Sequence, residues 1–432
     1  MDSIRIRGGT PLEGAIRISG AKNAALPLLC ASLLSDKPLT LSNMPYLADI
    51  VTMVRLLMQH GVDIRMSDDH EKWHVGDMTL GRSFILDGSR ITSREAPYEM
   101  VRKMRASVLV LGPLLARFGE ARVSLPGGCA IGSRPVDLHL KALEQMGAEI
   151  TLDQGYIVAS APDGLKGTDI LFDHVSVGAT ENIMMAATLA EGTTILNNAA
   201  REPEVQDLAH CLVKMGASIE GIGTATLTIH GRTTLRAAHH RVIADRIEAG
   251  TYVACTAMAS GDMLLKSAPV EAMRPLLEKC RETGVMIDEI DHETLHITSE
   301  GALEPVDIIT QPHPGFPTDM QAQFMAMMLR VNGTSTITET IFENRFMHVP
   351  ELMRMGADIH INGRSAVVKG VDTLVGAQVM ATDLRASVSL VIAALATRDE
   401  TMIHRIYHLD RGYEHLEMKL AGCGADIVRM RE

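Results

Sequence analysis

Gly61-Val62-Asp63-Ile64 is the first of six copies of one short pattern, in which Gly, then Ala or Val, any residue and Ile follow an apolar helical stretch. The copies begin at Gly61, Gly147, Gly216, Gly284, Gly356 and Gly424, with successive spacings of 86, 69, 68, 72 and 68 residues. A Gly that closes a helix can take the left-handed conformation, and the Ile after it favours a strand. The near-constant spacing predicts a chain built from six repeated α/β units.

A second signal lies upstream of the copies, where a polar turn leads into a short β-rich run, as in residues 119–125, 192–196 and 333–338. Each unit is therefore expected to contain a strand, a helix, the Gly and a second strand. A period of about 70 residues exceeds the roughly 20–50 residues of solenoid units and fits compact subdomains, grouped three and three into two similar lobes. The first spacing is the longest because of an insertion over residues 68–86, which we expect to be a hairpin or a loop.

The composition indicates a globular protein with aliphatic cores. At 432 residues the chain is long enough for two domains, and 46% apolar and 22% charged residues are ordinary for such proteins. Aromatic residues make up only 3%, so 27 Met are expected to help fill the cores. The net charge of −12 argues against general nucleic-acid binding, which needs a basic face, but not against a local basic pocket for a small anion.

The start of the chain, its longest apolar run and its Cys residues predict a cytoplasmic protein. The start, Met1-Asp2-Ser3-Ile4-Arg5, lacks the apolar stretch of a signal peptide, and the longest nearly apolar run, residues 23–34, is too short to span a bilayer. Six Cys, at positions 30, 129, 211, 255, 280 and 423, form no CxxC pair. We therefore expect free thiols in a reducing compartment, without a disulfide framework or a zinc site.

Residues 126–139, Pro-Gly-Gly-Cys-Ala-Ile-Gly-Ser-Arg-Pro-Val-Asp-Leu-His, interrupt the repeat with a chemically distinctive loop. Three Gly let this backbone approach a ligand closely. Cys129 lies five residues from Arg134, which favours a reactive thiol. The alternative is a turn that carries an incidental Cys. The other five Cys have apolar neighbours and are interpreted as small core residues.

Ser19-Gly20-Ala21-Lys22-Asn23-Ala24-Ala25-Leu26-Pro27 is a second distinctive segment. We expect Pro27 in the first turn of a helix, which places Lys22 and Asn23 at the helix N-terminus. Free backbone N–H groups, the helix dipole and an ammonium group there would make an anion site. The alternative is a solvated Lys beside a helix cap.

Three Arg stand in contexts that suit anion binding. Arg105 in Met-Arg-Ala-Ser and Arg385 in Leu-Arg-Ala-Ser both lead into apolar helices, so we interpret them as equivalent positions in the two lobes. Arg411 follows in Asp-Arg-Gly-Tyr. The planar guanidinium donates two parallel hydrogen bonds to phosphate or carboxylate. Each Arg alone also fits a surface ion pair, but the matched pair favours an anion shared between the lobes.

Asp319, in Gly-Phe-Pro-Thr-Asp-Met-Gln, leads into a Met-rich helix. From these residues alone, capping of that helix is the favoured role. A general base is the alternative if the carboxylate faces the site.

Together these segments closely resemble the enolpyruvyl transferase family, in particular its members that use UDP-N-acetylglucosamine. The resemblance extends from the first residues to Gly424-Ala425-Asp426-Ile427, and its most specific motifs are Ser-Gly-Ala-Lys-Asn-Ala, Pro-Gly-Gly-Cys, Arg-Pro-Val-Asp-Leu-His and Phe-Pro-Thr-Asp-Met-Gln. It implies a two-lobe, inside-out α/β barrel of six repeated units, with helices inside and sheets outside. One lobe would comprise residues 21–243 and carry the Cys loop, the other residues 1–20 and 244–432, with the substrates between them.

The resemblance also implies a reaction: transfer of the enolpyruvyl group of phosphoenolpyruvate to the 3-hydroxyl of UDP-N-acetylglucosamine, the first committed step of peptidoglycan synthesis. No metal or other cofactor is implied, and the expected partners are the two small-molecule substrates rather than nucleic acid or a membrane. The implied phosphoenolpyruvate ligands are Lys22, Asn23, Arg105, Arg134, Arg385 and Arg411. The implied UDP-N-acetylglucosamine ligands are Arg134, Pro135, Val136, Asp137, Leu138, His174, Val175, Ser176, Val177, Asp319 and Ile341.

The implied chemistry is addition followed by elimination, with Cys129, Asp319, Lys22 and Arg411 as the catalytic residues. The sugar hydroxyl attacks C2 of phosphoenolpyruvate while C3 takes a proton, and phosphate then leaves. The resemblance thus turns Asp319 from a cap into the base and makes Cys129 the acid, a thiol that can also add covalently to phosphoenolpyruvate. Clustered cations would stabilise the carboxylate and the leaving phosphate, and lobe closure would exclude water.

Two rival functions are open at this point. The sister enzyme that transfers enolpyruvyl to shikimate 3-phosphate shares the implied fold but lacks the Pro-Gly-Gly-Cys loop. A catalytically inactive regulator that binds nucleotide sugars would not need the full set of polar residues, all of which are present. This chain departs from the family pattern at His174, where many relatives have Lys, and at the insertion over residues 68–86.

We predict that Cys129 reacts selectively with an epoxide that resembles phosphoenolpyruvate, such as fosfomycin, because its loop and Arg134 favour the thiolate. Bound nucleotide sugar should accelerate the reaction by closing the loop. Cys129→Asp should keep substantial activity and resist the epoxide because it retains a transferable proton, whereas Cys129→Ala should lose most turnover. Mass spectrometry of the treated protein locates the modification. Modification at another Cys, or a fully active alanine variant, would remove Cys129 from the mechanism.

Overall fold

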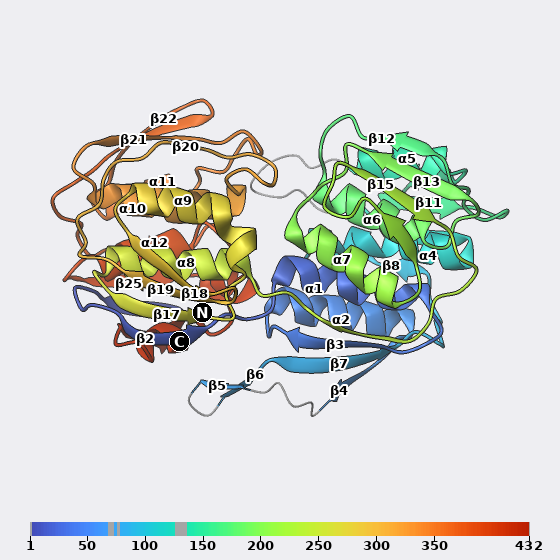
Figure 1. Ribbon diagram of the computed structural model, residues 1–432, viewed down its shortest axis with the longest axis horizontal. Helices are drawn as coiled ribbons and strands as arrows, with labels where there is room; N and C mark the ends of the chain where they lie inside the picture. Colours follow the sequence, from blue (N-terminus) through green and yellow to red (C-terminus); the bar gives the residue numbers. More distant parts are fainter. Residues whose placement is uncertain (1, 68–72, 76–77, 126–135, 432) are drawn as a thin grey trace.

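The computed structural model describes residues 2–67, 73–75, 78–125 and 136–431. Within these residues the strands form six four-stranded sheets and one two-stranded hairpin. Figure 1 shows the sheets divided between two lobes, one of which contains both chain termini. The α/β class and the repeated units predicted from the sequence are therefore confirmed.

The six predicted glycines each end a helix in the left-handed conformation, with φ between +90° and +106°. The bonds at Gly147 are typical: its N–H donates to the carbonyl of Glu144 at 2.9 Å, and the N–H of Ala148 donates to that of Leu143 at 3.0 Å. This pattern satisfies the last carbonyls of the helix and turns the chain into the next strand. Those strands are β4 (Asp63–Ser67), β10 (Glu149–Asp153), β14 (Ser218–Glu220), β18 (Met286–Asp291), β22 (Asp358–Asn362) and β26 (Asp426–Met430).

All six sheets share one topology, in which a parallel edge strand is followed by three antiparallel strands. The sheets of the first lobe are β16 (Ala238–Arg241), β3 (Leu39–Met44), β7 (Arg82–Asp87) and β4; β8 (Glu95–Ala96), β9 (Glu120–Ser124), β11 (Tyr156–Ser160) and β10; and β12 (Asp169–Leu171), β13 (Thr193–Asn197), β15 (Thr226–His230) and β14. Those of the second lobe are β2 (Glu13–Arg17), β17 (Asp262–Lys266), β19 (Thr294–Thr298) and β18; β20 (Ile308–Ile309), β21 (Thr334–Thr338), β23 (Ser365–Lys369) and β22; and β24 (Gln378–Met380), β25 (Glu400–His404), β1 (Ser3–Arg7) and β26.

Two helices belong to each unit. The first set, which we call the core helices, comprises α1 (Lys22–Ala31), α4 (Leu111–Phe118), α6 (Val177–Ala187), α8 (Arg246–Met258), α10 (Gln321–Met327) and α12 (Val388–Leu395). The second set precedes the repeated glycines and comprises α2 (Ala48–His60), α5 (Asp137–Gln145), α7 (Pro203–Lys214), α9 (Arg274–Glu282), α11 (Val349–Arg354) and α13 (Leu416–Ala421). Short helices η2 (Arg105–Val110) and η4 (Thr318–Met320) lead into α4 and α10, α3 (Tyr98–Val101) precedes η2, and η6 (Ile406–Arg411) lies between β25 and α13.

The core helices are enclosed by protein. Every residue of α12 is buried, as is every residue of α8 after Arg246. The strands around them alternate between buried and more exposed positions, as in β13 and β25, which is typical of sheets with one face in solvent. Helices inside and sheets outside are thus confirmed. The sheets stay separate, however, and the described strands do not join into a closed barrel.

Each lobe has its own hydrophobic core. One core draws on residues between Ala21 and Val242, and the other on residues between Ile4 and Ile18 and between Ala244 and Ile427. The chain passes from one lobe to the other near Gly20 and returns near Ala244. These two crossings pair with each other, because Gly20 and Ala244 form an antiparallel bridge. These separate cores support the proposed division into residues 21–243 and residues 1–20 plus 244–432, which stays a proposal at the level of single residues.

Because the chain passes from one lobe to the other and back, strands that are far apart in the sequence pair within one sheet. β16, which ends the first lobe, pairs in parallel with β3, and β2, which precedes the first crossing, pairs in parallel with β17. β1 lies between β25 and β26, so both ends of the chain are held in one sheet. The repeat pattern in the sequence cannot reveal these pairings between distant strands, because it does not show which part of the chain supplies the last strand of a sheet.

Two local expectations need correction. The insertion does contain a hairpin, β5 (Trp73–Val75) with β6 (Met78–Leu80), but β7 at its end is a central strand of the first sheet because it pairs with both β3 and β4. Pro27 is the sixth residue of α1 rather than part of its first turn, although Lys22 does begin that helix. No helix among the described residues is both long and apolar enough to cross a membrane.

We predict that Gly147→Ala lowers stability through backbone strain alone. A Cβ at Gly147 would meet nothing within 4 Å, but its φ is +95°, and the left-handed conformation costs an L-residue about 1–2 kcal/mol. Gly147→Asn should cost less, since Asn tolerates this conformation better. Thermal unfolding of both variants checks the order, and an alanine variant as stable as the wild type would contradict it.

Candidate active site

Several of the sequence-predicted residues lie at the N-termini of the core helices or of the short helices before them. Lys22 and Asn23 begin α1, Arg105 begins η2, and Ser176 caps α6 by accepting a hydrogen bond from the N–H of Ala179 at 3.3 Å. Asp319 lies in η4 and Arg385 three residues before α12. Because each unit repeats one topology, these starts are equivalent positions. Helix N-termini carry partial positive charge and free N–H groups, which suit anions.

A carboxylate from the first lobe joins the two predicted cations Lys22 and Arg411. Asp49, in the first turn of α2, accepts from Arg411 Nε at 2.8 Å and from Arg411 Nη2 at 3.4 Å. The Nζ of Lys22 lies 3.4 Å from the second oxygen of Asp49. Lys22 and Asp49 belong to one lobe and Arg411 to the other, so this ion pair crosses the interface.

Asp319 is the second junction between the lobes. Arg345 Nη2 donates to one carboxylate oxygen at 2.6 Å, while Asn23 Nδ2 donates to the other at 3.3 Å and Arg385 Nε lies 3.7 Å from it. Burial alone would raise the pKa of Asp319, but Arg345, Arg385 and Lys22 outweigh it and hold that pKa below its ordinary value. The carboxylate is therefore ionised and directed to side chains, and no capping bond from it to η4 or α10 is seen among the described residues.

Arg385 is only 2% exposed, yet it stays charged. Its Nη2 lies 3.5 Å from Asp245, its Nη1 donates to the carbonyl of Gly412 at 3.2 Å, and the guanidinium lies 5.4 Å from the ring centre of Tyr413. Burial opposes the charged form, but Asp245, Tyr413 and Asp319 outweigh it and raise the pKa of Arg385. Asp245 caps α8 at the second crossing, so Arg385 is tied to the connection between the lobes.

The charges of this cluster do not balance. Among the seven described side chains that pair here, Lys22, Arg345, Arg385 and Arg411 face Asp49, Asp245 and Asp319, which leaves one positive charge in excess. Burial lowers the pKa of Lys22, Arg385 and Arg411 lower it further, and Asp49 and Asp319 oppose the change. An anion that enters would favour the charged ammonium and relieve the repulsion among the cations.

The predicted nucleotide-sugar residues form two groups. In the first lobe, Val136 and Leu138 are buried at the start of α5, and His139 of the same helix lies beside Gly178, next to Val177. His174 is exposed, and Val175 to Val177 are half-buried. In the second lobe, Glu339 accepts from the backbone N–H of Ile341 at 2.7 Å and from Thr318 at 2.8 Å, which holds Ile341 near Asp319. No contact between the two groups is seen in the described part of the chain.

Comparison with known proteins identifies the family of the chain. The family model for EPSP synthase (3-phosphoshikimate 1-carboxyvinyltransferase) matches residues 6–420. The chain belongs to this family. It is 59% identical over its full length to a UDP-N-acetylglucosamine 1-carboxyvinyltransferase of Paramagnetospirillum magneticum, of which it covers 99%, and 58% identical to one of Rhodospirillum centenum, covering 100% of both chains.

Solved structures place the EPSP synthase family fold over the whole chain. The enolpyruvyl transferase NikO from Streptomyces tendae superposes with a TM-score of 0.87 at 25% identity, covering 99% of this chain and 98% of that one. An EPSP synthase from Acinetobacter baumannii superposes with a TM-score of 0.74 at 16% identity over 100% of both chains. The second likeness concerns the fold alone.

The structure leaves part of the predicted site undescribed. Cys129, Arg134 and Pro135 lie outside the described residues. Arg105 is half-buried and lies close enough to His139 to help lower the pKa of that His to about 4, although burial is the larger cause. The other five Cys are buried, and burial raises the pKa of each thiol, as expected for core residues.

Sequence reasoning missed three members of the cluster. Asp49 and Arg345 stand in stretches without a distinctive motif, so no local signal points to them. Asp245 could have been found as a helix cap, because Asp three residues before Glu248 resembles a capping box. This EPSP synthase family member thus adds carboxylates that neutralise most of the predicted cations.

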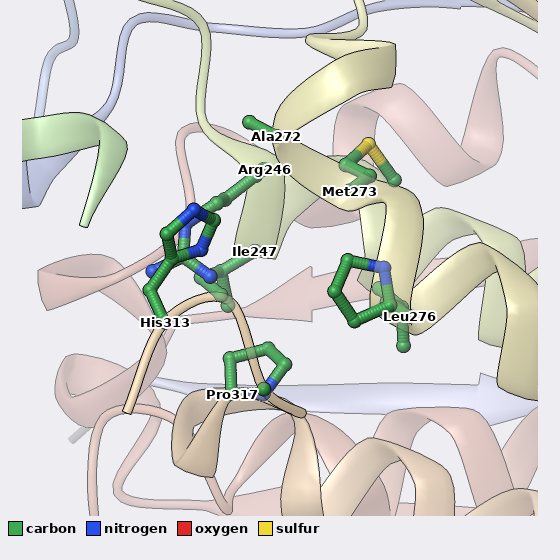
Figure 2. Close-up of a pocket in the computed structure, with 9 residues that line it drawn as sticks. Arg246, Ile247, Ala272, Met273, Leu276, His313 and Pro317 are labelled. Carbon is green, nitrogen blue, oxygen red and sulfur yellow. The ribbon is translucent and has the colours of Figure 1, made fainter. Parts of the chain in front are cut away.

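A small pocket lies beside this cluster rather than in it. It is lined by the start of α8, by η3 (Val270–Met273) and α9, and by the loop before η4, including Arg246, Ile247, Met273, Leu276, His313 and Pro317. Figure 2 shows Arg246 and His313 next to each other at this pocket. Arg246 Nε also donates to Glu204 of the first lobe at 2.9 Å. None of the sequence-predicted ligands that the structure describes lines this pocket.

We predict that Asp319→Asn destabilises the protein at pH 7 by about 2 kcal/mol, because buried Arg345 loses a charged hydrogen-bond partner and buried Arg385 loses an ion-pair partner. The pKa of Asp319 is lowered on folding, so its contribution is present above the unfolded pKa near 4 and disappears as the pH falls. The difference from wild type should therefore shrink between pH 5 and pH 3 in urea unfolding. Exposed Asp153→Asn is the control, and a difference independent of pH would contradict the ion pairing.

Proposed function

We propose that this chain transfers the enolpyruvyl group of phosphoenolpyruvate to the 3-hydroxyl of UDP-N-acetylglucosamine and releases phosphate. Relatives that are 56–59% identical over the full chain carry the name of this activity. The observation that supports the chemistry best is the cluster at the lobe junction, where buried cations from both lobes meet with one positive charge in excess. Both substrates are anions, and we place the reaction in the cytoplasm.

Phosphoenolpyruvate is proposed to bind at Lys22, Asn23, Arg385 and Arg411, with Arg105 and Arg134 completing the shell. Lys22 and Arg411 share Asp49, and Arg385 lies beside Asp319, so these donors already converge. A carboxylate and a phosphate placed among them would replace water by fixed donors. Because the donors come from both lobes, binding favours closure and the exclusion of water.

Asp319 is proposed as the base that takes the proton of the sugar hydroxyl. Its low pKa makes it a weak base while Arg345 and Arg385 both pair with it. A substrate anion would compete for Arg385, and the loss of one cationic neighbour raises the pKa of the remaining carboxylate. Phosphoenolpyruvate would thus strengthen the base at the moment when proton transfer is needed.

Cys129 is proposed as the acid that delivers a proton to C3 of phosphoenolpyruvate. The five described Cys are buried and have raised thiol pKa values, which favours Cys129, outside the described residues, as the reactive thiol. The nucleotide sugar is proposed to contact Val136 to Leu138 and His174 to Val177 in one lobe, and Asp319 and Ile341 in the other. The sugar oxygen would add to C2 between the two lobes, and loss of phosphate from C2 with loss of one proton from C3 would then restore the double bond of the enolpyruvyl product.

Phosphate release with each acceptor tests this function. With phosphoenolpyruvate, UDP-N-acetylglucosamine should support turnover and shikimate 3-phosphate should not. Asp319→Asn should lower turnover by about 10² or more while nucleotide-sugar binding weakens much less. Turnover with shikimate 3-phosphate alone would assign the chain to the sister reaction. Binding of the nucleotide sugar without turnover would make it a regulator.

A further inference from the structure

Glu414 joins parts of both lobes although it is not among the proposed ligands. It is 2% exposed, and one carboxylate oxygen accepts from Ser19 Oγ at 2.5 Å. The other oxygen accepts from the backbone N–H of Tyr46 at 2.8 Å. Ser19 adjoins the first crossing between the lobes, and Tyr46 lies in the first lobe just before α2. One carboxylate therefore links the crossing to the start of a helix in the opposite lobe.

The end of this link at Ser19 is rigid. Lys419 Nζ donates to Ser19 Oγ at 2.7 Å and to Glu248 at 2.5 Å, and the backbone N–H of Ser19 donates to Glu248 at 2.7 Å. All four side chains are at most 3% exposed. A buried, mutually bonded network of this kind holds its members in one arrangement.

The end at Tyr46 is fixed by more than one contact. The ring of Tyr46 stacks on His415, the residue after Glu414, with centroids 6.1 Å apart, and Arg82 lies 4.2 Å above the same ring. Tyr46 stands three residues before Asp49, whose carboxylate pairs with Lys22 and Arg411. The position of the Tyr46 backbone therefore determines the position of Asp49 relative to Lys22 and Arg411.

Asp49 supports the two cations without using all their donors. Arg411 presents Nε and Nη2, one edge of its guanidinium, to Asp49, and Arg carries five N–H donors in a planar fork. Lys22 likewise has three donors, of which one is directed at Asp49. Asp49 thereby orients both cations so that their other donors can meet a ligand, as outer partners do for metal ligands.

We propose that Glu414 is a positioning residue for the anion site: by binding the Tyr46 backbone across the lobe junction, it holds Asp49 where Asp49 orients Lys22 and Arg411. The inference rests on the proposed function, because it names the cations expected to bind phosphoenolpyruvate. Glu414 lies three residues after Arg411 in the same segment. One short stretch thus supplies a cation and fixes the partner of that cation in the other lobe.

The test measures binding of inorganic phosphate by calorimetry, which needs no turnover. Glu414→Ala should weaken phosphate binding about tenfold, as expected for loss of a hydrogen bond to a charged group. UDP-N-acetylglucosamine binding should change less than about twofold, since its proposed ligands are elsewhere. Hydrogen exchange at the Tyr46 amide should accelerate. Glu414→Gln keeps an oxygen that can accept from Tyr46 and should restore both phosphate binding and protection.

The decisive comparison is with Asp49→Asn. If Glu414 acts through Asp49, the double variant should bind phosphate no more weakly than Asp49→Asn alone. Glu417→Gln is the matched control, because Glu417 is a buried carboxylate nearby that pairs with Arg429 within one lobe at 2.8 Å. If Glu414→Ala does not fold, the shorter Glu414→Asp takes its place.

Additive losses in the double variant, an equal loss in Glu417→Gln, or unchanged phosphate binding would each overturn the positioning role. The proposed function fails separately, if wild-type protein releases no phosphate with UDP-N-acetylglucosamine. Phosphate binding still tests Glu414 in that case.

Discussion

The burial of the core helices on all sides is the constraint on which the rest of this structure depends. A helix such as α12, with every residue buried, cannot carry charged side chains along its length without a large desolvation cost. Charges are admitted at helix starts, where free N–H groups and partner side chains compensate them. The repeated topology gives every unit a helix N-terminus of this kind. Four of these N-termini, at α1, η4, α8 and α12, lie together where the two crossings pair. Their contacts are made by Asn23, Asp319, Asp245 and Arg385.

The cluster at these helix starts is held by polar contacts between the lobes, two of which are ion pairs. Arg411 meets Asp49, Asp319 meets Asn23, and Arg246 meets Glu204, each pair with one member in each lobe. Buried ion pairs contribute little net stability on average, but removal of one partner is costly. The arrangement therefore resists loss of any member, while a ligand anion can take the place of a carboxylate. This is the property that a binding site between two lobes requires.

The segment around Arg411 shows how a functional cation is fixed from several directions. Asp410 pairs with Arg429, the carbonyl of Gly412 accepts from Arg385, and the hydroxyl of Tyr413 bonds with Thr251 and Gln323. Glu414 completes the set by reaching Tyr46 in the other lobe. Consecutive residues thus bind different elements, so the position of Arg411 reflects packing throughout the lobe junction.

The sequence by itself determined the features that local chemistry encodes. Six glycines predicted six helix ends because the left-handed turn after a helix favours Gly wherever it occurs. Matched contexts around Arg105 and Arg385 predicted equivalent helix starts, and Lys22 was correctly expected at a helix N-terminus. Only the tertiary structure decided which distant strands pair within a sheet. It also showed that Asp319 faces Arg345 rather than capping its helix, and that the partner of Arg411 is Asp49, 362 residues away in the sequence. Such contacts depend on how the two lobes meet. The sequence around a carboxylate in an ordinary helix does not indicate a partner that lies hundreds of residues away, because the fold alone brings the two together.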